Sequence, residues 1–229
     1  MRSTEPGWIA GNPARLSASS GAFTAWIAGV FSVLAIGCAS APGLTPITST
    51  AQRMDFRGVS VQPPQGDNWY TAAAQRGPPG TLVAFYKKMG DWTPEHSAIA
   101  GLRLLDLDDQ RFETAEELGR FMDQVFREDH KRSTRFNLID STYAVDASFG
   151  AICVRLHQAQ EDRGVPGRAG QRFLIDAHAI RCIHPRSPRY LVDISFSERR
   201  RDNRASWWSR GLQEEVEPYL NSLQFLPLE

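Results

Sequence analysis

The feature that most constrains what this chain can fold into is a series of four consecutive segments with β-strand patterning. One helical segment precedes this series and another follows it. The four strand segments are 135–146, 151–158, 172–184 and 190–197. In the last segment Tyr190, Val192, Ile194 and Phe196 alternate with polar residues. This alternation is typical of an antiparallel strand with one packed face and one solvated face. Further strands are expected at 55–61, 81–87 and 99–107. The last of these alternates poorly, so a short helix is the alternative there.

The two helical segments are 114–132 and 206–223. In the first, Thr114 and Glu117 have the spacing of a capping box, and apolar residues follow on one stripe. The second also has an apolar stripe, although Pro218 can kink it. The order of strands, helix, four strands and helix predicts an α+β domain. We expect one antiparallel β-sheet of about six to seven strands, backed by the two helices.

An uncharged apolar run precedes these segments. Residues Gly21 to Gly37 contain 17 residues without a charge, and Arg2 and Arg15 lie before them. A basic start followed by such a run is typical of a secretory signal peptide. The run is at the short end of the ~17–25 residues that can span a bilayer, so a signal anchor is the alternative.

The end of this run, Leu34-Ala35-Ile36-Gly37-Cys38, resembles the lipobox of bacterial lipoproteins, with Ala35 in place of the usual leucine. The resemblance implies that the chain is cut before Cys38 and that this cysteine is acylated. Ala39 then implies the outer membrane, with the protein facing the periplasm, in an organism that has one. The alternative is an ordinary cleaved signal followed by a chance cysteine. The expected organisation is a signal peptide at 1–37, a flexible tether at 38–53 and one folded domain at 54–229.

The folded part resembles the PsbP-like fold, a family named for an extrinsic subunit of photosystem II. The similar pieces are FRGVSVQPPQGDNW at 56–69, TAEELGRFM at 114–122, and the strand at 190–197 followed by a long helix. The resemblance implies a PsbP-like α/β sandwich. It implies no particular role, because members of one fold differ widely in function.

The other two cysteines, Cys153 and Cys182, are placed opposite each other if 151–158 and 172–184 form a hairpin. The turn then falls in the glycine-rich loop at 164–170, and the same register sets His157 opposite His178. In an exported compartment this arrangement favours a disulfide, with free buried thiols as an alternative. A metal shared by the two cysteines and the two histidines is excluded, because four residues of strand separate the cysteine pair from the histidine pair by ~13 Å. A metal on the two histidines, with Asp176 approaching them, is a third alternative.

A run of arginines, comprising Arg199, Arg200, Arg201 and Arg204, follows the last strand and is a candidate site for an anionic group of the envelope. The alternative is a solvated junction whose arginines pair with acids. Beside this run, we expect one indole of Trp207-Trp208 in the core and the other over a groove. His96 and His130 are expected at the surface.

The composition limits the possible functions. The 26 Lys and Arg residues balance 26 Asp and Glu residues, which argues against binding nucleic acid by bulk electrostatics. The sequence contains none of the common hydrolase, nucleotide-binding or metalloprotease motifs, so we assign no catalytic residue, metal or cofactor. The sequence favours a membrane-anchored envelope lipoprotein that binds or scaffolds an envelope protein or anionic ligand and is not an enzyme. The alternatives are an envelope hydrolase and a carrier of small apolar ligands.

Overall fold

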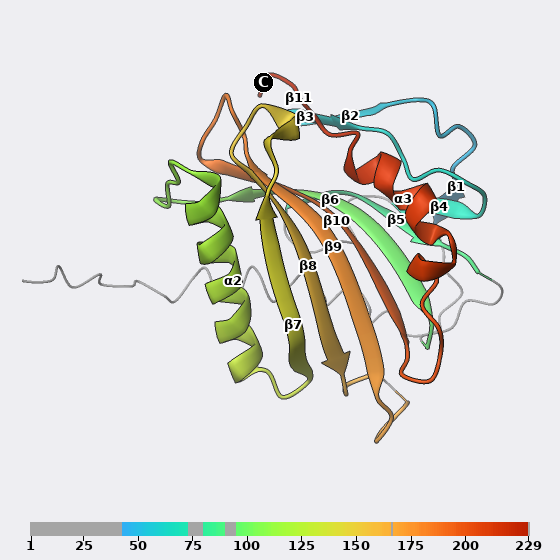
Figure 1. Cartoon of the computed structure of the whole chain (residues 1–229). Coiled ribbons are helices and arrows are strands. Elements are labelled where there is room, and N and C mark those ends of the chain that lie inside the picture. Colours follow the sequence, from blue (N-terminus) through green and yellow to red (C-terminus); the bar gives the residue numbers. More distant parts are fainter. Residues whose placement is uncertain (1–42, 73–79, 90–94, 166, 229) are drawn as a thin grey trace, which may run out of the picture.

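The computed structural model describes residues 43–72, 80–89, 95–165 and 167–228. The main element is an eight-stranded sheet in the order β1-β4-β5-β6-β10-β9-β8-β7 (Figure 1). Each neighbouring pair in it is antiparallel. The strands are β1 (Leu44–Pro46), β4 (Trp69–Ala72), β5 (Thr81–Lys87), β6 (Ser97–Asp106), β7 (Phe136–Val145), β8 (Cys153–Asp162), β9 (Phe173–Ile183) and β10 (Tyr190–Arg201).

A small second sheet is formed from the two ends of the described chain. It has the order β11-β3-β2, and its strands are β2 (Met54–Phe56), β3 (Val59–Val61) and β11 (Gln224–Phe225). The helices are α2 (Ala115–Arg132), α3 (Leu212–Leu220) and the single 3-10 turns η4 (Ala147–Phe149) and η5 (Trp208–Arg210). The α+β architecture with two main helices is therefore confirmed. The number of strands in the main sheet was underestimated.

The two helices cover opposite faces of the main sheet. Val192 and Ile194 of β10 pack in one cluster with Val216 of α3, whereas Leu191 packs in another with Leu118 of α2. Successive residues of a strand point to opposite faces, so the molecule has three layers. Figure 1 shows α2 beside β7, and α3 at the other side of the sheet.

The prediction that one face of β10 is solvated is wrong, because helices cover both faces of the sheet. Asp193 lies on the α2 face, is fully buried, and forms ion pairs with Arg103 and Arg181. Burial acts to raise the pKa of Asp193, but the two arginines outweigh it, and the pKa lies below its ordinary value. The alternation of apolar and polar residues along β10 therefore reflects two covered faces, of which one is apolar and the other contains paired charges.

The helix at 114–132 is confirmed, including its cap. The Thr114 hydroxyl accepts the backbone N–H of Glu117, and the Glu117 carboxylate accepts the backbone N–H of Glu113. The second helix is shorter than the predicted range 206–223. Gly211 has φ +105°, which separates η5 from α3, so α3 begins only at Leu212.

The N-terminal region differs from the predicted tether at 38–53. β1 lies within that range and pairs with β4, and the backbone N–H of Ile47 donates to Trp69 at 2.9 Å. Residues 44–46 of this segment thus belong to the sheet. Cys38 and the signal peptide at 1–37 lie outside the described residues. Among the helices that are described, none has both the length and the apolar character needed to cross a membrane.

Candidate functional site

The β8–β9 hairpin has the predicted register. Cys153 is opposite Cys182, and His157 is opposite His178. A disulfide joins the two cysteines, both of which are fully buried in the core that α3 covers. The disulfide prediction therefore agrees with the structure, and the free-thiol alternative does not. Because both sulfur atoms are used in this bond, neither is available as a metal ligand.

The segment Ser206–Trp208 is held on the sheet by a buried carboxylate from β10. Glu198 accepts hydrogen bonds from the Ser206 hydroxyl at 2.5 Å and from the backbone N–H groups of Trp207 at 2.8 Å and Trp208 at 3.3 Å. Its other neighbour is Nε2 of His96 at 2.7 Å. Burial acts to raise the pKa of Glu198, but these hydrogen bonds outweigh it, and the pKa is lowered. Glu198 therefore stays an anion that fixes this segment.

Each indole of this segment stacks on a histidine. The Trp207 and His96 ring centroids are 3.2 Å apart, and those of Trp208 and His178 are 3.9 Å apart. Trp208 also packs against Phe196 of the core. We expected one indole in the core and the other over a groove, but both indoles are half-buried. The segment presents two aromatic rings that are fixed in place at the molecular surface.

The histidine predictions are corrected in part. His96 was expected at the surface, but its side chain is only 18% exposed because it lies between Glu198 and Trp207. His130 is also half-buried, with its ring nitrogens beside the Phe126 carbonyl and the Gln160 side chain. Single histidines of this kind carry no pattern in the sequence that would reveal their partners.

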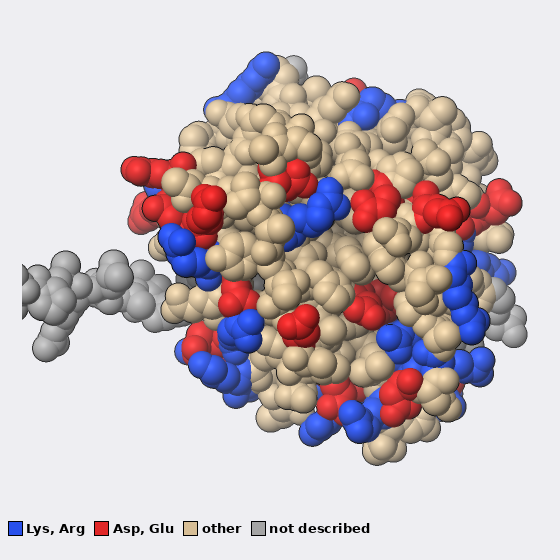
Figure 2. All heavy atoms as spheres, viewed as in Figure 1, with Lys and Arg blue, Asp and Glu red and all other residues tan. Residues whose placement is uncertain are grey.

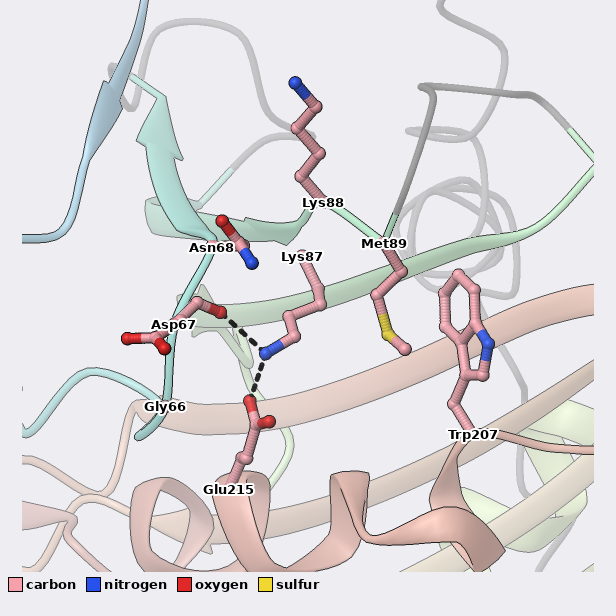
Figure 3. A pocket seen from close by; sticks show the side chains of 8 residues that line it. All are labelled: Gly66, Asp67, Asn68, Lys87, Lys88, Met89, Trp207 and Glu215. Atoms are coloured by element: carbon pink, nitrogen blue, oxygen red, sulfur yellow. Dashed lines mark hydrogen bonds and ion pairs between the residues drawn. The ribbon is translucent and has the colours of Figure 1, made fainter.

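An open depression of about 630 Å³ lies beside Trp207 (Figure 3). It is lined by residues from the loop before β4, the end of β5, α3 and the tryptophan segment: Gly66, Asp67, Asn68, Lys87, Lys88, Met89, Trp207 and Glu215. Figure 3 shows the Met89 thioether and the Trp207 indole next to each other at one end. The other end is polar, and the depression therefore offers an apolar wall beside charged groups.

The polar end is built by contacts between the loop, β5 and α3. Lys87 Nζ donates to the Asp67 carbonyl at 2.7 Å and forms an ion pair with Glu215. The same carboxylate accepts Trp69 Nε1–H at 2.8 Å. A Cβ atom on Gly66 would lie 2.6 Å from the Glu215 carboxyl carbon, and Gly66 has φ +84°, so glycine allows this close approach.

Beyond Trp208, the same face of the sheet carries a polar cluster. His157 Nε2 lies 3.0 Å from Asp176 Oδ1, and the His157 side chain is 40% exposed. Arg200 Nη2 lies 3.4 Å from the other oxygen of Asp176. The pKa of His178 is lowered to about 4 by burial and by the neighbouring His157, so this ring is neutral near pH 7. In the part of the chain that the structure describes, no group of three or more His, Cys, Asp or Glu side chains could hold a metal ion.

The four candidate anion-binding arginines are not gathered at one place. β10 continues to Arg201, so Arg199 and Arg200 point to opposite faces of the sheet. Arg199 is buried and pairs with Asp162, Arg200 pairs with Asp176, and Arg201 pairs with Glu95 at 2.5 Å. Arg204 is exposed. On the face in Figure 2 acidic and basic side chains are interspersed, and this agrees with arginines that neutralise acids.

Comparisons with known proteins found likenesses in structure only. No family model matches the chain, and no curated protein matches it. The crystal structure of LpqN, described as involved in cell envelope biogenesis of Mycobacterium tuberculosis, is 13% identical with a TM-score of 0.44, covering 77% of this chain and 90% of that one. The solution structure of cyanobacterial PsbP (CyanoP) from Synechocystis sp. PCC 6803 is 14% identical with a TM-score of 0.40, covering 83% and 99%. At these identities and TM-scores we take no function from either protein.

Proposed function

We propose that this chain is a lipid-anchored protein of the cell envelope whose folded domain binds a protein partner across Trp207 and Trp208. The anchor is acylated Cys38, and Ala39 favours the outer membrane with the domain facing the periplasm. The lipobox-like sequence before Cys38 supports this location. The Cys153–Cys182 disulfide agrees with it, because disulfides persist in exported compartments.

The observation that carries the proposal is the way Glu198 fixes two neighbouring indoles at the surface. Tryptophan is enriched among the residues that dominate binding energy at protein interfaces. A side chain that is already ordered loses little conformational entropy when a partner binds. Stacking on His96 and His178 orders both rings before any partner is present.

The shape of the surface also favours a protein partner over a small molecule. Small ligands are typically bound in clefts that enclose most of their surface. The depression beside Trp207 is open, as is a second one that Phe149, Leu223 and Phe225 help to line. A partner with an apolar side chain could cover Met89 and Trp207 and still reach the polar end. This geometry favours a protein partner over the alternative of a small-ligand carrier.

The proposal is tested by photo-crosslinking in cells, with a photoreactive side chain in place of Met89. We expect one dominant crosslinked species that is lost when Trp207→Ala is added. A photoreactive side chain at Asp109 is the control, since Asp109 is exposed and follows the opposite end of β6. Equal crosslinking at both positions, or crosslinking that Trp207→Ala leaves unchanged, would contradict the proposed surface.

A further inference from the structure

The main sheet begins very close to the proposed lipid anchor. Five residues, 39–43, separate Cys38 from Leu44, the first residue of β1. β1 is joined to the rest of the domain, because Leu44 is paired with Ala72 and Pro46 with Tyr70. Ile47, directly after β1, packs against the core. A chain fixed at Cys38 is therefore fixed again at one edge of the sheet.

The length of this connection limits how far the edge can be from the bilayer. Six residue steps at ~3.6 Å each span at most ~22 Å. The strand order places β7 seven strand spacings from β1, which is ~34 Å at ~4.8 Å each. Figure 1 shows β1 and β4 at one side of the molecule and β7 with α2 at the other. The β1 edge is thus the part of the domain held nearest to the anchor.

The chemistry of this edge suits a lipid headgroup surface. The segments 44–52, 69–72 and 81–86 contain no charged residue, although 23% of the whole chain is charged. The one charged residue of β5 is Lys87 at its end, which is buried and paired with Glu215. Placing such a surface against a bilayer requires no charge to leave water. Tyr70 and Tyr86 face each other across β4 and β5, and tyrosine is enriched at membrane–water interfaces.

We propose that the edge formed by β1, β4 and β5 lies against the lipid headgroups, with β7 directed away from the membrane. This inference rests on the proposed anchoring at Cys38 and adds an orientation to it. One edge of the domain then always faces the bilayer, and Trp207 and Trp208 are presented from one face of the sheet.

The test uses the full chain, processed in the producing cell and reconstituted in phosphatidylcholine vesicles that contain a nickel-chelating lipid. A spin label is attached to Thr45→Cys in β1 or, as the matched control, to Thr142→Cys in β7. Both threonines are exposed. The label should react only with the added thiol, because Cys153 and Cys182 form a disulfide and Cys38 is expected to be acylated.

We expect nickel at the headgroups to broaden the spectrum of the label at Thr45 and to leave the label at Thr142 unchanged. Thr48→Cys, also exposed, gives a second site beside β1 in case Thr45→Cys disturbs the strand. Equal broadening at both edges, or stronger broadening at Thr142, would overturn the orientation while the anchor stands. Protein that does not float with the vesicles would refute the anchor, and the orientation would fail with it.

Discussion

Glu198 is the residue on which the presentation of both indoles depends. It is fully buried, and its carboxylate is the shared acceptor for Ser206, Trp207 and Trp208. Donors that are buried without an acceptor lose the hydrogen bonds that they make with water in the unfolded chain. Removing this carboxylate therefore leaves these donors without their shared acceptor, and leaves the ring contacts of the two indoles to hold the segment on the sheet.

We expect Glu198→Ala to lower the free energy of unfolding by about 3 kcal/mol, because several donors are left unpaired. Urea unfolding followed by tryptophan fluorescence measures this change. Glu214→Ala is the control, since Glu214 is exposed at the start of α3 and its removal should cost less than about 0.5 kcal/mol. Equal losses in the two variants would show that Glu198 does not fix the segment.

His178 should make stability depend on pH. Its pKa is lowered from 6.5 to about 4 by burial and by His157, so between these values the unfolded chain binds a proton that the folded chain does not. The free energy of unfolding should therefore fall as the pH is lowered from about 6.5 to about 4, by about 3 kcal/mol at most.

The contribution of His178 is isolated with His178→Phe, which keeps an aromatic ring beneath Trp208. The titratable groups that act on His178, namely His157, Asp176, Arg155 and Glu198, all remain in the variant. We expect the variant to lose less stability than the wild type between pH 6.5 and pH 4 in urea unfolding series. Parallel pH profiles would mean that the pKa of His178 is not lowered in the folded state.

Residue pairs were predictable from the sequence only where a strand register fixed them. The sum of residue numbers about a glycine-rich turn placed Cys153 opposite Cys182 and His157 opposite His178. The role of Glu198 could not be predicted in this way, because its partners follow a turn of unpatterned sequence. The sequence left open whether the arginines form an anion site or pair with acids. The length of β10 decides how they are placed, because alternating faces separate Arg199 from Arg200, and each pairs with an acid.

At the scale of elements, helix α2 depends on its first turn. Thr114→Ala removes the acceptor for the Glu117 backbone N–H and should lower the free energy of unfolding by about 1 kcal/mol. Thr114→Ser keeps a hydroxyl and should restore most of this loss. Thermal or urea unfolding followed by circular dichroism measures both variants. Identical stabilities of Thr114→Ala and the wild type would contradict the role of the cap.

Long elements with a clear period were predicted well, and short ones were not. The helix at 114–132 and the strands at the centre of the sheet have enough residues to show their period. β1 and β4 have three and four residues, and β1 ends on Pro46, so no alternation marks them. Gly211 marked a weak point in the helix predicted at 206–223, but the sequence did not show that its backbone adopts φ +105° and that the helix begins only at Leu212.

At the scale of the whole molecule, the disulfide links the two strands of the β8–β9 hairpin. Cys153 and Cys182 are 29 residues apart in sequence, so the bond restricts a loop of the unfolded chain. We expect the double variant Cys153→Ala/Cys182→Ala to lose about 3–4 kcal/mol of stability. A reducing agent should destabilise the wild type and leave this variant unchanged, as measured by urea unfolding. Insensitivity of the wild type to reduction would contradict a stabilising disulfide.

The three-layer arrangement could be predicted only in part from the sequence. Two amphipathic helices and a mostly alternating set of strands indicate a sheet with helices packed on it. Which face each helix covers depends on contacts between distant residues, such as Val192 with Val216 and Leu191 with Leu118. The buried pair of Asp193 and Arg103 hid the second covered face, because its residues read as polar surface.

The location proposed for the protein rests on Cys38, and the mass of the intact chain extracted from membranes of the producing cell tests it most directly. The account predicts a chain that begins at Cys38 and carries acyl groups on that residue, and it predicts that Cys38→Ser abolishes both the cleavage and the acylation. A chain that begins elsewhere, or an unmodified Cys38 in the membrane fraction, would contradict it.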